Sequence, residues 1–313
     1  MYIPEHEVRA ALAYDALIPA IRQALIDYSA GLVDQPARMI LRAGNEEDYR
    51  NGWFAVMPVI YGDLMGVKTV TFYPGNAEID PALGLHTHMA IVEVLRRSTG
   101  EPLAVMDGRL ITEMRTAAVS AVALDALAPP EAASLGILGS GVQARSHLQA
   151  LRLVRPALKD VRIWSRTAAN AERLAEETGA HAVTVQEAAS ADVVLTVTAS
   201  TNPVLEGRWF APHALVLAVG ATGSALRELD DEAMLRSYVV AESRSCAERE
   251  SGDVRLSGAH VQVEIGEILS GSVAVPRDKP IVFKSVGMAI EDLTAAKLVL
   301  EALGSAVPRP PKK

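Results

Sequence analysis

A glycine-rich turn between two apolar runs is the first feature of this sequence that predicts chemistry. Residues 135–138 read as a strand, Gly139-Ser-Gly-Val-Gln-Ala144 follows, and a run of helical length comes next. In this G-x-G-x-x-A pattern, Gly139 permits a tight turn, Gly141 lets the backbone approach a pyrophosphate, and Ala144 lets the helix pack on the strand. The amides that open the helix then face the phosphates. The pattern predicts a dinucleotide site, with a purely structural glycine turn as the alternative.

The end of the next strand bears on which dinucleotide is bound. Residues 161–164 read as a strand, and Ser165, Arg166 and Thr167 follow it. An NAD site usually has Asp or Glu at this point, whereas the 2′-phosphate of NADP needs donors and positive charge. Asp160 lies before the strand, at its wrong end. The sequence therefore predicts NADPH in preference to NADH, unless Arg166 is only a solvated loop cation.

Three cations stand in unusual places in the first part of the chain. Lys68 shares a strand face with apolar residues, so its ammonium requires an anion or a route to water. If Thr112 caps a helix, Arg115 lies in the first turn, where free amides and the guanidinium would form an anion pocket. Arg38 begins a short apolar strand. Each cation taken alone can also be a surface or snorkelling side chain.

Two histidines raise the question of a metal site. His86 and His88, at positions i and i+2, would share a face of a strand. No cysteine cluster or group of carboxylates supplies further ligands, so we expect no metal. His88 is then a pocket-lining or proton-relaying residue, or an ordinary hydrogen-bonded histidine. The sequence has no G-x-S-x-G or H-E-x-x-H pattern, and hydrolytic chemistry is unsupported.

The first part of the chain reads as a run of strands with little helix. Apolar residues at helical spacing predict an amphipathic helix from Leu17 to Tyr28. Strands are expected around 38–41, 53–60, 67–73, 87–95 and 102–106. An alanine-rich helix then extends from Arg115 to the Pro129-Pro130 stop.

From Ser134 the pattern alternates between strands and helices. Strands are expected near 135–138, 161–164, 182–185, 193–198, 215–219, 238–241 and 281–284, with a final helix at 287–302 that can return to the first domain. The alternation predicts a Rossmann-type doubly wound parallel sheet, an α/β fold, beside a strand-rich α+β domain. We assign residues 1–114, completed by the C-terminal helix and tail at 287–313, to the substrate-binding and dimerisation domain, and residues 115–286 to the NAD(P)-binding domain.

Composition limits the kinds of partner. A chain of 313 residues exceeds what one core usually organises, which agrees with two domains. The net charge of −8 argues against nucleic-acid binding. The single cysteine, Cys246, excludes an intramolecular disulfide, and we find no signal peptide or apolar run of membrane-spanning length. We expect a cytoplasmic protein with no membrane partner and a disordered tail at 308–313.

Several motifs together resemble the ornithine cyclodeaminase/mu-crystallin family over nearly the whole chain. They are Val67-Lys-Thr-Val-Thr-Phe-Tyr73, Leu103-Ala-Val-Met-Asp-Gly108, Arg115-Thr-Ala-Ala-Val-Ser120, Gly136-Ile-Leu-Gly-Ser-Gly-Val-Gln-Ala144, Glu250-Ser-Gly-Asp253 and Phe283-Lys-Ser-Val-Gly-Met-Ala289. The resemblance is closest to the mu-crystallin (ketimine reductase) branch, through Ala55-Val-Met-Pro58, Arg162-Ile-Trp-Ser-Arg-Thr167, Arg227-Glu-Leu-Asp-Asp231 and Val282-Phe-Lys-Ser285.

The resemblance implies a homodimer that associates through the strand-rich domain, with an active site between that domain and the dinucleotide domain. By the matching positions, Arg38, Lys68 and Arg115 would hold the carboxylate of a small imino or amino acid against the nicotinamide. The candidate cofactor-binding residues are Gly139, Ser140, Gly141, Val142, Gln143, Ala144, Ser165, Arg166, Thr167, Thr116, Val197, Thr198, Val219 and Gly220.

Thr222 marks a departure from part of this family. Cyclodeaminases and the related alanine dehydrogenases carry an Asp two residues after the glycine that ends the fifth strand, where this chain has Gly220-Ala-Thr222. The mu-crystallin branch also lacks a carboxylate there, so the departure favours reduction of a ready-made imine over oxidation of an amine. His88 matches a histidine of that branch, whereas His86 has no recognised counterpart.

The sequence therefore predicts NADPH-dependent reduction of the C=N bond of a small, cyclic 2-imino carboxylate, an imine reductase activity. The catalytic candidates are Lys68, Arg38, Arg115, His88 and Thr222. Two alternatives remain open at this point. One is an amino-acid dehydrogenase or an ornithine or lysine cyclodeaminase, and the other is a binding or structural protein, like a thyroid-hormone binder or a lens crystallin.

Overall fold

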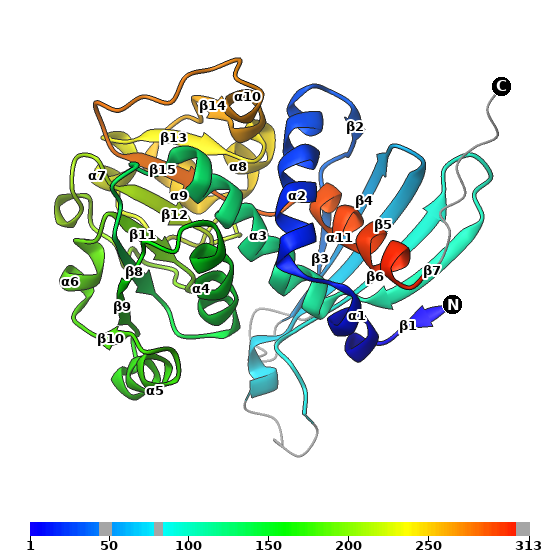
Figure 1. The fold of residues 1–313 in the computed structure, drawn as a ribbon, viewed down its shortest axis with the longest axis horizontal. Coiled ribbons are helices and arrows are strands. Elements are labelled where there is room, and N and C mark those ends of the chain that lie inside the picture. The colour runs from blue at the N-terminus through cyan, green and yellow to red at the C-terminus, as the bar shows by residue number, and fades with distance from the viewer. Residues whose placement is uncertain (44–51, 78–83, 305–313) are drawn as a thin grey trace. The chain divides into compact units, whose positions relative to one another are not determined.

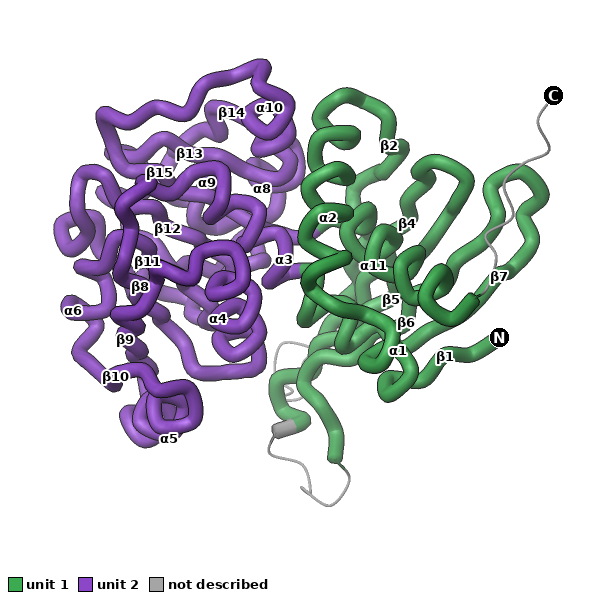
Figure 2. Tube along the Cα trace, in the orientation of Figure 1, with its two compact units in different colours: residues 1–115, 288–313 green, residues 116–287 purple. Residues whose placement is uncertain are grey.

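The chain divides into two compact units. The computed structural model describes residues 1–43, 52–77 and 84–304, and the predicted disordered tail lies outside them. Unit 1 comprises residues 1–115 and 288–313, and unit 2 comprises residues 116–287 (Figure 2). Each boundary lies one residue further along the chain than expected from the sequence.

Unit 1 is built on a seven-stranded sheet (Figure 1). Its strands are β1 (Tyr2–Ile3), β2 (Val33–Asp34), β3 (Met39–Arg42), β4 (Trp53–Tyr61), β5 (Leu64–Phe72), β6 (His88–Arg96) and β7 (Pro102–Asp107). The order is β1-β7-β6-β5-β4-β2, with β3 also paired to β4, and every pair except β1 with β7 is antiparallel. Along β5, buried residues alternate with half-buried ones up to Val70. The sheet therefore has one core face and one outer face.

Helices cover the core face of this sheet. Unit 1 contains α1 (Glu5–Ala11), α2 (Tyr14–Ser29), the start of α3 (Arg109–Leu127) and α11 (Ala289–Ala302). Helix α11 packs against α2, β4, β5 and β6. The predicted final helix thus returns to the first unit, and its first eight residues are all buried.

Unit 2 is an eight-stranded parallel sheet with the order β10-β9-β8-β11-β12-β15-β13-β14. The strands are β8 (Ser134–Leu138), β9 (Asp160–Trp164), β10 (His181–Ala182), β11 (Val193–Thr196), β12 (Leu215–Ala218), β13 (Tyr238–Ala241), β14 (Val263–Glu264) and β15 (Ile281–Lys284). Besides the rest of α3, the helices are α4 (Val142–Val154), α5 (Ala168–Thr178), α6 (Val185–Ala189), α7 (Asp231–Leu235), α8 (Arg244–Glu250), α9 (Gly252–Ser257) and α10 (Ile265–Leu269). Strand order reverses on either side of β8, which confirms the predicted doubly wound fold class.

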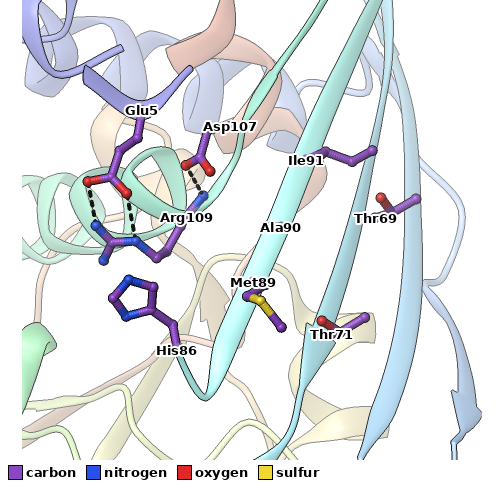
Figure 3. A pocket seen from close by; sticks show the side chains of 9 residues that line it. All are labelled: Glu5, Thr69, Thr71, His86, Met89, Ala90, Ile91, Asp107 and Arg109. Atoms are coloured by element: carbon purple, nitrogen blue, oxygen red, sulfur yellow. Dashed lines mark hydrogen bonds and ion pairs between the residues drawn. The ribbon is translucent and has the colours of Figure 1, made fainter. Parts of the chain in front are cut away.

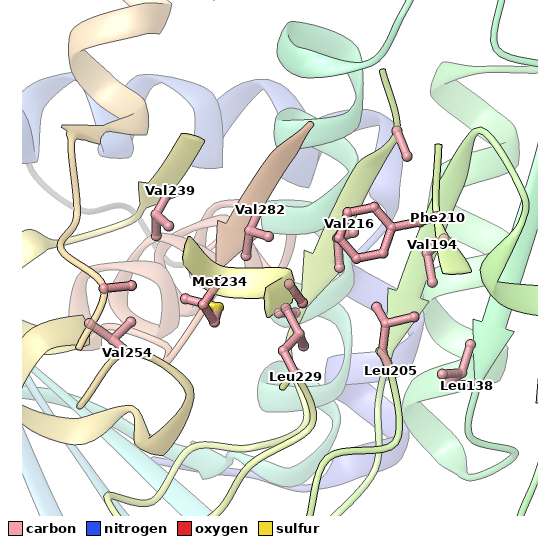
Figure 4. Packing of buried hydrophobic residues seen from close by; sticks show 14 of the residues in the cluster. Leu138, Val194, Leu205, Phe210, Val216, Leu229, Met234, Val239, Val254 and Val282 are labelled. Atoms are coloured by element: carbon pink, nitrogen blue, oxygen red, sulfur yellow. The ribbon is translucent and has the colours of Figure 1, made fainter. Parts of the chain in front are cut away.

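The core of unit 2 is made of small and branched apolar residues. Strands β11, β12 and β15 are buried at every position. Val194, Val216, Val239 and Val282 project from neighbouring strands into one cluster, which Phe210 completes (Figure 4). This packing on the sheet fixes the strands whose carboxyl ends carry the candidate site.

Two elements differ from the sequence-based prediction. Helix α3 begins at Arg109 rather than Arg115, because the Asp107 side chain accepts the Arg109 N–H at 3.0 Å and so supports an earlier start. The strand predicted at 182–185 ends at Ala182, and helix α6 follows, because Thr184 and Glu187 form a capping box. Within the described residues, no helix is both long and apolar enough to cross a membrane.

Candidate cofactor and substrate sites

The glycine turn of unit 2 joins β8 to α4 and requires a residue without a Cβ. Gly139 has a φ of +128°, and a Cβ on it would lie 2.8 Å from the carbonyl oxygen of Val197. The Gly139 N–H donates to the carbonyl oxygen of Trp164 at 2.9 Å. The turn therefore lies close to the carboxyl ends of β9 and β11, where ligands of doubly wound sheets bind.

The first turn of α4 is open to a ligand. Gly141 occupies the N-cap position, where the described structure has no side-chain cap, and a Cβ there would meet no atom within 4 Å. Ser140 precedes the cap, Val142 and Gln143 are the first residues of α4, and Ala144 is fully buried. The helix N-terminus can accept an anion at this point, since its N–H groups and dipole both favour negative charge.

The loop after β9 contacts the glycine turn through two hydroxyl groups. The Ser140 hydroxyl donates to Ser165 Oγ at 2.9 Å. Arg166 and Thr167 are exposed, and Thr167 is the N-cap residue of α5. Asp160 lies at the other end of β9 and pairs with Arg162 at 2.6 Å. The residues that follow β9 are therefore hydroxyls and a guanidinium.

The loops after β11 and β12 lie beside each other. The N–H groups of Val219 and Gly220 donate to the carbonyl oxygen of Thr196, at 3.0 and 3.1 Å. Val197 donates to the Leu138 carbonyl at 2.9 Å, and Thr198 follows it. Thr222 is exposed in the loop after β12, whereas Thr116 is buried in α3. Apart from Thr116, the predicted cofactor-binding residues and Thr222 therefore lie at the edge of the unit 2 sheet where its strands have their carboxyl ends.

Lys68 and Arg115 form a buried cluster with two carboxylates of α11 in unit 1. The Lys68 Nζ lies 2.7 Å from Asp292 Oδ2. Arg115 donates from Nη1 to Glu291 Oε2 at 2.7 Å and from Nε to Asp292 Oδ1 at 3.1 Å. All four side chains are less than a tenth exposed. Arg38 is half-buried just before β3.

The structure corrects the sequence argument for an anion pocket at a helix N-terminus. The Thr112 hydroxyl donates to the Gly108 carbonyl at 2.7 Å instead of capping a helix, because α3 has already begun at Arg109. Arg115 therefore lies inside the helix. The anion that the buried Lys68 ammonium requires comes from within the chain, since Asp292 pairs with both Lys68 and Arg115.

Sequence reasoning missed Glu291 and Asp292. Their signal was an acidic pair in the first turn of an otherwise apolar helix. Such a pair is easily interpreted as a favourable interaction with the helix dipole. Only the packing of α11 on β5 shows that the carboxylates face cations far away in the sequence.

The cluster shifts the pKa of two of its members. Burial, followed by the positive charges of Arg115 and Arg38, lowers the pKa of Lys68 to about 8, although Asp292 opposes the shift. Burial and the charges of Lys68 and Arg115 lower the pKa of His88 to about 4. At neutral pH, Lys68 therefore carries a charge and His88 does not.

The two histidines do not share a strand face. His88 is the first residue of β6, whereas His86 is exposed in the segment before it. The metal-binding arrangement considered from the sequence therefore does not form. The part of the chain that the structure describes contains no group of three or more His, Cys, Asp or Glu residues placed to hold a metal ion.

A cavity lies on the outer face of the unit 1 sheet. It has a volume of about 370 Å³ (Figure 3), and its lining includes His86, Thr69 and Thr71. Glu5 binds the Arg109 guanidinium there through two hydrogen bonds of 2.6 and 2.8 Å. Thr69 and Thr71 alternate along β5 with Lys68, so this cavity and the buried cation cluster lie on opposite faces of the sheet.

The fold and these sites define a class of protein. A doubly wound sheet with a glycine turn at its switch point is typical of a dinucleotide-binding unit. The second unit adds a buried set of cations on a separate sheet. The class is therefore a two-domain protein with a dinucleotide-binding type of fold in unit 2 and a buried cluster of ion pairs in unit 1.

Comparison with known proteins places the chain within this class. The model of the ornithine cyclodeaminase/mu-crystallin family matches residues 1–306. Ketimine reductase mu-crystallin from Macropus fuliginosus is 42% identical over 298 residues, which is 92% of each chain. The chain belongs to the ornithine cyclodeaminase/mu-crystallin family, which confirms the resemblance seen in the sequence.

Two solved structures are similar over almost the full length. Delta(1)-pyrroline-2-carboxylate reductase of Thermococcus litoralis, solved with NADH and L-proline, has a TM-score of 0.89 at 30% identity and covers 99% of both chains. An archaeal alanine dehydrogenase dimer with bound NAD has a TM-score of 0.90 at 28% identity, covering 100% of this chain and 98% of its own. Both relatives bind a nicotinamide dinucleotide.

Proposed function

We propose that this protein reduces the C=N bond of a small cyclic 2-imino carboxylate with NADPH. The reaction class, imine reduction by a nicotinamide-dependent oxidoreductase, is that of its curated relatives and confirms the expectation from the sequence. One observation carries the substrate assignment. The buried Lys68 ammonium lies 2.7 Å from Asp292 Oδ2, and because an ammonium has three N–H donors it can bind Asp292 and a substrate carboxylate together.

The protein would bind and orient both reactants. The cofactor supplies the hydride when it is bound. The first turn of α4 holds the pyrophosphate, and Lys68, Arg115 and Arg38 hold the substrate carboxylate. Burial lowers the pKa of His88 to about 4, so its neutral imidazole is a poor acid for the imine, which can instead take its proton from solution before binding. Thr222 contributes a neutral hydroxyl, which is no base for oxidising an amine.

The proposed preference for NADPH rests on the loop after β9. Arg166 can form paired, charge-assisted hydrogen bonds to a 2′-phosphate, and Ser165 and Thr167 add hydroxyl donors. No carboxylate follows β9 in this loop to bind a ribose 2′-hydroxyl. NADH would therefore bind more weakly than NADPH.

The proposal includes a homodimer formed through the outer face of the unit 1 sheet. Met39 and Leu41 of β3 and Met89 and Ile91 of β6 are all more than a third exposed. Apolar residues gathered on one sheet face favour burial against another protein surface. A second copy of the chain would cover them, and the similar archaeal alanine dehydrogenase is a dimer. We also keep the cytoplasm as the expected location, since Cys246 is a buried free thiol.

The assay that tests the function follows NADPH oxidation with pyrroline-2-carboxylate and piperideine-2-carboxylate. Linear imino acids, ornithine, lysine and alanine serve as comparison substrates. We expect the cyclic imino acids to be reduced fastest and ornithine to release no appreciable ammonia, because Thr222 cannot act as a carboxylate base. Release of ammonia from ornithine at a rate rivalling imine reduction would contradict the proposal and favour a cyclodeaminase.

The lowered pKa of Lys68 predicts an alkaline loss of substrate affinity. The ammonium is present below its pKa of about 8 and is lost as the pH rises through that value. The inhibition constant of pyrrole-2-carboxylate, which has no imine nitrogen to titrate, should therefore rise by about tenfold per pH unit above this pKa. In Lys68→Arg the rise should disappear, because a guanidinium stays protonated. An identical alkaline rise in both proteins would assign the titration to another group.

A further inference from the structure

Three sequence motifs with no role in the proposed reaction meet in the interior of unit 2. Glu228, Asp253 and Lys284 come from separate segments, and all three are fully buried. The Lys284 Nζ donates to Asp253 Oδ2 at 3.0 Å. Asp253 Oδ1 accepts the backbone N–H groups of Glu228 and Leu229, at 2.8 and 3.0 Å. Lys284 and Asp253 therefore fix the backbone that carries Glu228.

The Glu228 carboxylate holds the loops after β11 and β12. Its Oε1 accepts the Thr198 N–H at 2.5 Å. Its Oε2 accepts the N–H groups of Gly220 and Ala221, at 2.8 and 3.0 Å, and the Thr196 hydroxyl at 2.9 Å. One side chain thus receives four hydrogen bonds from the ends of two neighbouring parallel strands.

The loops after β11 and β12 lie so close together that the residue at position 220 has no room for a side chain. A Cβ on Gly220 would lie 2.1 Å from the Thr198 carbonyl oxygen and 2.6 Å from Glu228 Oε1. Burial and the charge of Asp253 raise the pKa of Glu228, although the charge of Lys284 and the hydrogen bond from the Thr198 N–H oppose the rise. Three backbone N–H donors and a hydroxyl favour an acceptor-only carboxylate, so the arrangement is specific for Glu228 in its ionised form.

These loops lie where the nicotinamide half of a dinucleotide would bind. Ser165 marks the adenosine side of the switch point, and the start of α4 marks the pyrophosphate. The other half of the cofactor must extend past β8 over β11 and β12. We propose that Glu228 is a positioning residue that aligns the loops at Thr198 and Gly220 for the nicotinamide, with Asp253 and Lys284 as its supports. This inference rests on the proposed cofactor site.

Glu228→Gln tests the inference with two ligands measured by calorimetry. Whichever way the new amide turns, its NH₂ group faces either the Thr198 N–H or the N–H groups of Gly220 and Ala221, so a loop must move. We expect the dissociation constant of NADPH to rise by about 10- to 100-fold. That of 2′-phospho-ADP-ribose, which lacks the nicotinamide, should stay within about twofold.

Asp192→Asn is the matched control. Asp192 accepts the N–H groups of Ala133 and Ser134 and the Ser134 hydroxyl, before β8 and so at the amino end of the sheet. The Asp192→Asn variant should have a lower melting temperature, while its dissociation constants for NADPH and for 2′-phospho-ADP-ribose should stay unchanged. A wild-type NADPH affinity in Glu228→Gln would overturn the inference, as would an equal loss for both ligands, which indicates general loosening.

Thr196→Val is the second variant, because it removes one donor to Glu228 and keeps the carboxylate. The NADPH dissociation constant should rise by about two- to fivefold, again with no change for 2′-phospho-ADP-ribose. An unchanged NADPH affinity in a folded Thr196→Val protein would overturn the inference even if Glu228→Gln does not fold. Wild-type protein that binds neither NADPH nor NADH would instead remove the proposed cofactor site itself.

Discussion

Replacing Lys68 by methionine should lower kcat/KM for a cyclic imino acid by about 10- to 100-fold, because hydrogen bonds to charged groups contribute about 1.5–3 kcal/mol. The same change should lower the free energy of unfolding by about 3 kcal/mol, since it leaves the buried Asp292 carboxylate with fewer partners. This loss lies at the lower end for buried pairs, because Arg115 still contacts Asp292. Steady-state kinetics and urea unfolding measure the two effects separately.

The double variant Lys68→Met/Asp292→Asn separates stability from binding. Removing both charges should restore much of the lost stability, because the uncompensated carboxylate is gone. The kcat/KM should stay low, because the ammonium that we propose to bind the substrate is still missing. If activity returned together with stability, the defect of the single variant would come from misfolding. A wild-type kcat/KM in Lys68→Met would place the carboxylate site elsewhere.

Arg166→Asp should lower kcat/KM with NADPH by about 100-fold and leave that with NADH unchanged or higher. The variant loses the guanidinium that would bind the 2′-phosphate and places a negative charge beside it. Because Arg166 is exposed, the preference of the wild-type protein for NADPH should also weaken as ionic strength rises. Kinetics with both cofactors at low and high salt provide the measurement.

Arg173→Asp is the control for this change of charge. Arg173 is exposed on α5, near the loop in sequence, and its side chain bonds Asn170 at 2.9 Å. The substitution alters the net charge equally but should leave the ratio of the two cofactors unchanged. If both variants change the ratio of kcat/KM for NADPH to kcat/KM for NADH by the same factor, the overall electrostatic potential of the surface determines the cofactor preference. An unaltered ratio in Arg166→Asp would show that another residue binds the 2′-phosphate.

The glycine turn was predictable from sequence because its pattern is local. Gly139, Gly141 and Ala144 lie within six residues of one another, and the positive φ of Gly139 is a property that glycine adopts readily, although Val197 also restricts that position. Lys68 was placed correctly on a buried strand face, since side chains alternate with a period of two. The start of α3 was missed because the cap was sought at Thr112, whereas Asp107, two residues before the helix, accepts the Arg109 N–H.

The partners of the buried charges are decided only by the tertiary structure. Sequence alone determined the strand alternation, the glycine turn and the family motifs, each of which is a pattern along the chain. The ion pairs of Arg115 with Glu291 and Asp292 join residues 176 and 177 positions apart. In unit 2, the buried pair of Lys284 and Asp253 also joins two separate segments of the chain, 31 positions apart. A buried ammonium or guanidinium requires some anion, but which carboxylate supplies it depends on how helices pack against strands, and no local spacing encodes that choice.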